Sequence, residues 1–175
     1  MTMESEKFNQ PERRDSMKTE EIFELTPEQE PISFTPVGGD LEKIGIDSKE
    51  KLVLFPPEEQ QEISKTITVS FFIPEKGKPI NREAIERWCK ENGWRLATGF
   101  ELASLYEKLW KDYNEKKIDE RELNEKLYSL RSAVAIGDSC KGNYVATSKP
   151  NWDYSLTLFS PQELNDNFRF AIVKL

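Results

Sequence analysis

Two short segments near the C-terminal end carry residue types that could do chemistry. Residues 137–143 hold a hydroxyl at Ser139, a thiol at Cys140 and an amine at Lys141. A nucleophile needs a base to activate it, and Lys141 is the only candidate nearby in the sequence. Turn chemistry explains the same Gly-, Asp- and Asn-containing stretch. We therefore expect a loop here and no catalytic residue.

The second segment follows Pro150 and combines amide, carboxylate and aromatic side chains. Trp and Tyr are frequent at recognition hot spots, and their rings also stack on sugar faces. Packing of Trp152 into the core is the alternative interpretation. The candidate ligand-binding residues are Asn151, Trp152, Asp153, Tyr154 and, on a preceding strand, Tyr144.

The sequence contains no histidine. This excludes His-based general base catalysis, Ser–His and Cys–His nucleophile pairs, and metal ligation by imidazole. Basic residues alternate with acidic ones in the C-terminal two thirds, and no glycine-rich phosphate-binding loop occurs, so a nucleic-acid partner is not expected. The sequence predicts a protein that is not an enzyme and that has no cofactor and no metal site.

Charge is distributed unevenly over the 175 residues. Residues 1–62 contain 16 acidic and 7 basic side chains, whereas residues 63–175 contain 16 and 18. The first part has few periodic apolar positions, so it cannot offset its chain entropy by burial. Its short apolar pieces, in 31–37 and 51–57, predict an extended arm or a loose linker. We expect an acidic, largely disordered tail or linker at 1–62 and one domain at 63–175.

Location follows from two further features. There is no apolar run of membrane-spanning length and no apolar signal segment near the first residue, so no membrane contact and a cytoplasmic location are expected. Cys89 falls on the apolar face of a predicted helix, which favours a buried free thiol. A Cys89–Cys140 disulfide stays open as the alternative if the chain is exported.

The elements that position these residues can be predicted from their patterns. Residues 66–73 are β-branched and aromatic and end at Pro74, which is typical of a strand. Asn81 can cap a helix that buries Ile85, Trp88 and Cys89 and that ends at Gly93.

A second helix begins at Thr98, which forms a capping box with Glu101. The residues of one helical face recur at a spacing of three or four: Leu102, Leu105, Tyr106, Leu109, Trp110 and Tyr113. A third helix begins at Asp119 and buries Leu123, Leu127 and Leu130. Because only the segment 93–98 joins the first two helices, they must cross and bury Trp88 and Leu102 against the sheet.

Beyond Ser132 the chain changes to short apolar runs separated by turn-rich segments, at 133–136, 144–147, 155–159 and 168–173. A strand, then helices, then strands predict an α+β fold in which two to three helices pack on a small antiparallel sheet.

This order resembles C-type-lectin-like domains, including bacterial lectin-like and formylglycine-generating-enzyme-like relatives that carry a Gly-Trp-Arg-Leu segment before a helix. The matching residues are Ala84, Cys89, Gly93, Trp94, Arg95, Leu96, Ala97, Thr98, Glu101, Leu102, Leu105 and Tyr106. Residues 143–148 and 168–173 are similar to later strands of those relatives. The resemblance covers about residues 66–175 and implies a lectin-like fold. A helix–turn–helix pair in an unrelated α+β domain is the alternative.

The expected function follows from the family motifs that this sequence lacks. Calcium-dependent members use a Glu-Pro-Asn-like motif with a Trp-Asn-Asp strand, and here only Asn151-Trp152-Asp153 occurs, out of order. Too few oxygen ligands remain for calcium. Cys89 and Cys140 do not match the cysteine motif of the formylglycine-generating relatives, and the iron-dependent relatives need histidine.

The sequence therefore predicts a non-catalytic, calcium-independent module that binds a protein or glycan through its C-terminal loops. A structural or assembly subunit of a phage or surface apparatus is the alternative, and a degenerate enzyme of the formylglycine-generating-like fold is a further one.

Overall fold

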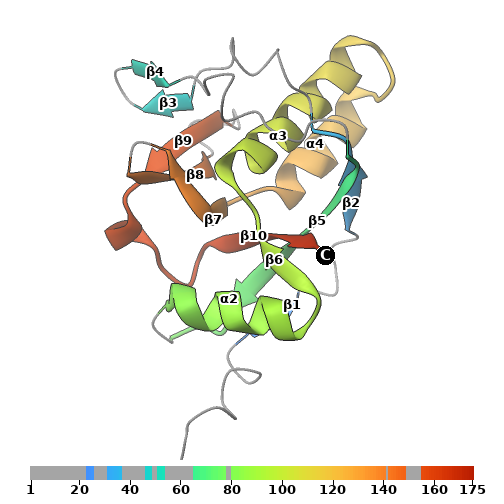
Figure 1. Cartoon of the computed structure of the whole chain (residues 1–175). Coiled ribbons are helices and arrows are strands. Elements are labelled where there is room, and N and C mark those ends of the chain that lie inside the picture. The colour runs from blue at the N-terminus through green and yellow to red at the C-terminus, as the bar shows by residue number, and fades with distance from the viewer. Residues whose placement is uncertain are drawn as a thin grey trace, which may run out of the picture.

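The computed structural model describes residues 23–25, 31–36, 46–48, 51–53, 65–77, 80–140, 142–148 and 155–175 (Figure 1). Its helices are α2 (Arg82–Glu91), α3 (Gly99–Asn114), α4 (Glu120–Ser129) and the short 3-10 helix η4 (Pro161–Glu163). Its strands are β1 (Phe23–Leu25), β2 (Ile32–Phe34), β3 (Ile46–Ser48), β4 (Lys51–Val53), β5 (Ile67–Pro74), β6 (Trp94–Leu96), β7 (Ala133–Cys140), β8 (Asn143–Ser148), β9 (Ser155–Phe159) and β10 (Arg169–Lys174). The α+β class expected from the sequence is confirmed, but the small antiparallel sheet is not, because the eight-stranded sheet contains a parallel pair, β10 with β7.

Eight of these strands form one sheet, in the order β1-β5-β10-β7-β8-β9. The short strands β2 and β6 pair with β5 and β10. Strand β10 lies at the centre, antiparallel to β5 and parallel to β7, while the other pairs are antiparallel. Strands β3 and β4 form a separate hairpin near β9. The first long strand and the last strand of the described chain are therefore neighbours.

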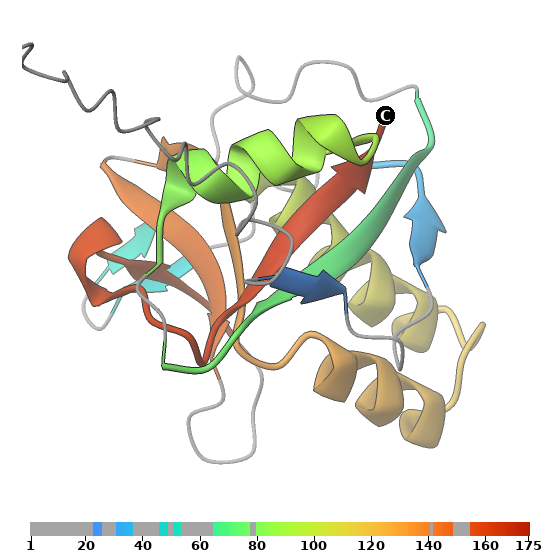
Figure 2. The same cartoon turned by 90° about the horizontal axis from the view of Figure 1, so that it is seen from below.

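The sheet has a hydrophobic core on each face. Along β10, Ala171 and Val173 pack with α3 and α4, whereas Phe170 and Ile172 pack with α2. This alternation is the period of two that a strand buried on both faces requires. Figure 2 shows α2 lying across one face of β10 and β5, with α3 and α4 behind the sheet. The predicted inner faces of α2 and α4 are buried, whereas on α3 the leucines are buried and Tyr106, Trp110 and Tyr113 are half-buried.

The segment between α2 and α3 differs from its expected form. Instead of a bare connector, residues 94–96 form strand β6, which pairs with the end of β10. The chain thereby passes from one face of the sheet to the other, so Trp88 and Leu102 are buried in different cores. The two helices do not cross each other, because the sheet lies between them.

Local signals place the helix ends as predicted. The Asn81 side chain accepts a hydrogen bond from Ala84 N at the start of α2. Thr98 and Glu101 form the reciprocal capping box of α3, and Asp119 accepts from Glu122 N at the start of α4. Gly93, just past α2, has a φ of 77°, a left-handed conformation that favours glycine.

The sheet extends beyond the boundary expected at residue 63. Strand β1 pairs with residues 72–74 of β5, and β2 pairs with residues 67–69. Phe34 is only 5% exposed and belongs to the core under α3 and α4. For residues 31–36, which were expected to form either an extended arm or a loose linker, the structure shows the extended arm. The rest of 1–62, apart from the β3–β4 hairpin, lies outside the described residues.

We predict that Phe34 contributes to the stability of the whole domain. Replacing a buried Phe by Ala leaves a cavity, so Phe34→Ala should lower the free energy of unfolding by about 3 kcal/mol. Urea denaturation of the full chain measures this. The control is Ser33→Ala in the same strand, where an exposed side chain is lost and the change should be below about 1 kcal/mol. Equal stabilities for the two variants would contradict a structural role for β2.

Candidate functional site

Strand β7 bends away from its neighbour before it ends. Ala135 pairs with Val145 and Cys140 pairs with Asn143, so β7 has three more residues than β8 between these two pairs. The extra residues turn toward the segment that precedes α3. There the Gly137 N–H donates to the Ala97 carbonyl at 2.8 Å, and Asp138 Oδ1 accepts from the Gly99 N–H at 2.7 Å. Residues 137–140, expected to be a loop, are thus a bulged part of β7.

Close backbone packing holds this bulge in place. A Cβ atom on Gly137 would lie 2.5 Å from the Ala97 carbonyl oxygen, and one on Gly99 would lie 2.6 Å from Val145 Cγ2. Both positions therefore need glycine because there is no room for a side chain. Such bulges are frequent beside functional sites, since they redirect individual side chains. Here the bulge directs Asp138 to the N-terminus of α3.

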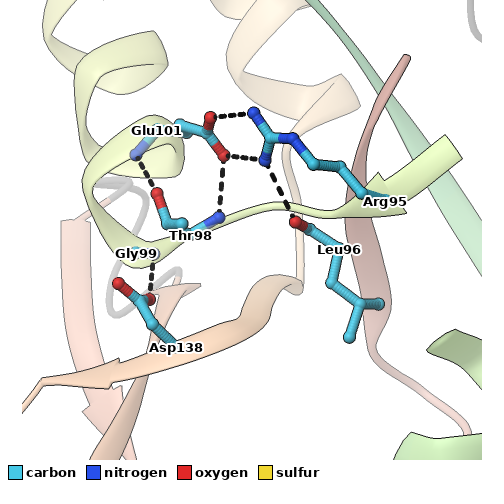
Figure 3. A network of polar contacts seen from close by, with 6 residues as sticks. All are labelled: Arg95, Leu96, Thr98, Gly99, Glu101 and Asp138. Atoms are coloured by element: carbon cyan, nitrogen blue, oxygen red, sulfur yellow. Dashed lines mark hydrogen bonds and ion pairs between the residues drawn. The ribbon is translucent and has the colours of Figure 1, made fainter. Parts of the chain in front are cut away.

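A second polar group meets the first turn of α3 from the other side (Figure 3). Arg95, on β6, donates from Nη1 to Glu101 Oε2 at 2.9 Å and from Nη2 to Oε1 at 2.5 Å. The Thr98 N–H donates to the same Oε2 at 2.8 Å, which completes the capping box. Glu101 is 8% exposed, so its charge is buried and is compensated by the guanidinium.

Beside this network the surface opens into a cleft of about 660 Å³. The described residues that line it come from the ends of β5, β6 and β10, the first turn of α3 and the β7 bulge. They are Pro36, Lys65, Thr66, Ile67, Thr68, Arg95, Thr98, Phe100, Glu101, Asp138, Val173, Lys174 and Leu175. A volume of this size is typical of sites for small molecules or short segments. We take this cleft as the candidate functional site.

The two side-chain carboxylates of the cleft, Glu101 and Asp138, both take part in hydrogen bonds of the fold. Both oxygens of Glu101 accept hydrogen bonds from Arg95, and Oε2 also accepts from Thr98 N. Asp138 caps α3, where the helix dipole stabilises its negative charge. These bonds tie both groups to the fold. In the described part of the chain, no group of three or more His, Cys, Asp or Glu side chains could hold a metal ion.

Of the five candidates taken from the sequence, the structure describes only Tyr144. Asn151, Trp152, Asp153 and Tyr154 lie outside the described residues. Tyr144 lies on β8, half-buried against the core under α2, and is not among the residues that line the cleft.

The cysteine on α2 has the environment that its place on the helix predicts. Cys89 is fully buried and is a free thiol, so it does not form the alternative disulfide with Cys140. Burial and the nearby Glu86 raise the pKa of the Cys89 thiol to about 12. The thiolate is therefore scarce at neutral pH, and Cys89 acts as a small apolar side chain.

Comparisons with protein families, with curated proteins and with solved structures find no match to this chain. No helix in the described residues is long and apolar enough to span a membrane. The cleft must therefore be interpreted from its own chemistry.

Sequence reasoning placed Arg95, Thr98 and Glu101 in a connector and a cap, and missed that they border a cleft. Lys65 and Lys174 are far apart in the sequence, and both line the cleft because β5 and β10 pair antiparallel. The available signal was that residues 66–73 and 168–173 are both predicted strands. Two strands of one sheet can be neighbours, and their ends then lie close together.

We predict energetic coupling between Arg95 and Glu101. Loss of either partner leaves a buried charge or an unused donor, so a double-mutant cycle of Arg95→Gln and Glu101→Gln should give a coupling energy of about 1.5 kcal/mol. The control cycle is Arg121→Gln with Glu125→Gln, a pair with side chains 87% and 66% exposed. That pair should couple by no more than about 0.5 kcal/mol. Similar values from the two cycles in chemical denaturation would contradict the role given to burial.

We also predict that Gly137 cannot accept a side chain. Gly137→Ala forces the β7 bulge and residue 97 apart, and overpacking of this kind should cost about 1–3 kcal/mol in thermal or urea unfolding. Ser139→Ala, an exposed change in the same bulge, should alter stability by less than about 0.5 kcal/mol. A fully stable Gly137→Ala variant would show that the close approach is dispensable.

Proposed function

We propose that this chain is a non-catalytic, calcium-independent binding module whose ligand, a protein or a glycan, sits in the cleft between β5, β10 and the start of α3. The observation that carries the proposal is the cleft itself, about 660 Å³ in volume and walled by two central strands and a capped helix. Sites built on such elements keep their shape when empty, which favours binding over a folding transition. The proposal replaces the loop 151–154 by the cleft as the leading site.

The absence of catalysis is supported by how the polar groups are used. Glu101 accepts hydrogen bonds from Thr98 N–H and from Arg95, and Asp138 accepts one from Gly99 N–H. The sequence offers no histidine as an alternative proton carrier. What remains for a ligand is the two exposed lysines Lys65 and Lys174 and the apolar atoms of the lining, which suits recognition.

We further propose that the fold is C-type-lectin-like. The order of β5, α2, the Gly93–Thr98 segment, α3 and the closing strands supports this, since it is the order on which the resemblance rests. A shared fold alone does not assign a ligand, so the proposal for the function is argued from the cleft.

The test is to fill the cleft. The full chain is screened on a peptide array and on a glycan array, and the binders are measured again with Thr66→Trp, which places an indole at the cleft wall. We expect Thr66→Trp to weaken the binders by about tenfold or more, because the ligand and the indole compete for one volume. The matched control is Glu120→Trp on the exposed start of α4. If both variants bind as the unchanged chain does, or if neither array gives a binder, the proposed function is wrong.

A further inference from the structure

A row of side chains crosses four strands at the end of the sheet that borders the cleft. Ser33 of β2 pairs with Thr68 of β5, and Trp94 of β6 pairs with Lys174 of β10. The register of β5 and β10, continued by one residue beyond its last pair, places Thr68 opposite Lys174. Adjacent strands lie about 4.8 Å apart, so this polar row is roughly 14 Å long from Ser33 to Trp94.

The polar row lies on the face of the sheet that carries α2. On each of β2, β5 and β10, a residue adjacent in sequence to the row is buried in the core under α3 and α4; these residues are Phe34, Val69 and Val173. Successive side chains of a strand point to opposite faces, so Ser33, Thr68 and Lys174 point to the other face. Trp94 packs against the core under α2, which places it on that face too. Ser33 and Lys174 are exposed and the other two are partly exposed, so a ligand can reach the row.

Two pairs of hydroxyl groups occupy one end of this surface. Ser33 Oγ and Thr68 Oγ1 lie 2.8 Å apart, and Thr35 Oγ1 and Thr66 Oγ1 lie 3.0 Å apart on the same two chain segments. Each pair uses one hydrogen in its own bond and keeps a second O–H together with unused lone pairs. These pairs can therefore both donate to a ligand and accept from it.

The other end of the row supplies donors alone. The Lys174 ammonium and the Trp94 indole N–H have no acceptor capacity. Neither group has a hydrogen-bond or ion-pair partner among the described residues, and the indole nitrogen of Trp94 is not buried. Both are therefore available to oxygen atoms of a ligand.

This mixture of groups selects a neutral ligand that both donates and accepts. A carboxylate or phosphate group only accepts, and an ammonium group only donates, so each would match a part of the row. Charge gives little selection, because Lys65 and Lys174 share the cleft with the exposed carboxylate of Asp138. A hydroxyl group donates one hydrogen bond and accepts others, so a ligand rich in hydroxyls matches every position.

A peptide cannot join the sheet here as a further strand. Strand β10 is paired with β5 on one side and with β6 on the other, and β5 is paired with β10 and β2. The two strands in the middle of the row therefore have no open edge, which strand addition requires. What they offer is side-chain groups on one face of the sheet.

We infer that the polar row binds a neutral oligosaccharide, whose hydroxyl groups bond to the Ser33–Thr68 pair, to the Lys174 ammonium and to the Trp94 indole N–H. The inference rests on the proposed function and specifies its ligand class, because Thr68 and Lys174 also line the cleft. The row extends the binding site from the cleft to β6.

The probes are cellotriose, maltotriose and N,N′,N″-triacetylchitotriose, each titrated into the isotope-labelled full chain and followed by NMR. The indole signal of Trp94 is assigned with Trp94→Phe. We expect at least one probe to shift this signal and the amide signals of Thr68 and Lys174 in a saturable manner. The affinity should change by less than about twofold between low and high salt, because a neutral ligand forms no ion pair.

Two variants test the row separately. Thr68→Val keeps the shape of the side chain and removes a hydroxyl, and Trp94→Phe keeps an aromatic ring and removes the N–H. Each should weaken the bound trisaccharide by about fivefold, the contribution of one hydrogen bond. The matched controls are Thr157→Val on β9 and Trp110→Phe on α3, which make the same changes outside the row and should leave the affinity unchanged. Thermal unfolding shows whether each variant and its control are equally folded.

Three outcomes overturn the inference. They are no shift of the Trp94 signal by any of the three probes, equal weakening by the row variants and their controls, and tighter binding of the charged sugar sialyllactose than of every neutral probe. The proposed function fails differently. A binder from the peptide array that Thr66→Trp weakens, while the sugars leave the Trp94 signal unchanged, would support the cleft as a binding site and contradict the oligosaccharide.

Discussion

The structure depends on the passage of the backbone between α2 and α3 through the sheet, where β6 lies beside the end of β10 and next to β7. Leu175 N–H donates to Gly93 O, Ala97 N–H to Ala171 O, and Gly137 N–H to Ala97 O, so this short segment is bonded to both β10 and β7. Backbone groups of this segment are hydrogen-bonded where the chain changes faces. Buried N–H and C=O groups need such partners because no water reaches them. These bonds fix the place where the chain changes faces, and so α2 and α3 pack into separate cores on opposite faces of the sheet.

The same passage explains why the cleft lies where it does. Strand β6 brings Arg95 to the start of α3, and the β7 bulge brings Asp138 to it from the opposite side. The first turn of a helix has unpaired N–H groups, and here side chains of this chain supply the acceptors. The helix end is therefore already satisfied by protein groups. The N-terminus of α3 therefore offers no free N–H at Gly99 or Glu101 to the neighbouring cleft.

Much of the fold could be predicted because its signals are local. Asn81, Thr98 and Asp119 mark helix starts through side-chain caps that depend on a few neighbouring residues, and all three are confirmed. The strand character of residues 94–96 could not be predicted in this way, because it exists only through pairing with β10. Phe34 is a similar case, since nothing near it in the sequence shows that β5 would bury it. Both features depend on pairing with a strand that is distant in the sequence, and no local sequence pattern predicts that pairing.

The candidate site was harder to predict for a related reason. Its chemistry comes from residues that have ordinary roles in the sequence, such as the lysines at the ends of two strands. Trp and Tyr drew attention to residues 151–154, whereas the cleft contains no exposed aromatic ring in its described lining. Glu101 illustrates the point best. In the sequence it is a helix cap, and in the structure its buried carboxylate also takes the charge of Arg95. That pairing offsets the charge of Arg95, so Lys65, Lys174 and the exposed carboxylate of Asp138 carry the remaining side-chain charges of the cleft.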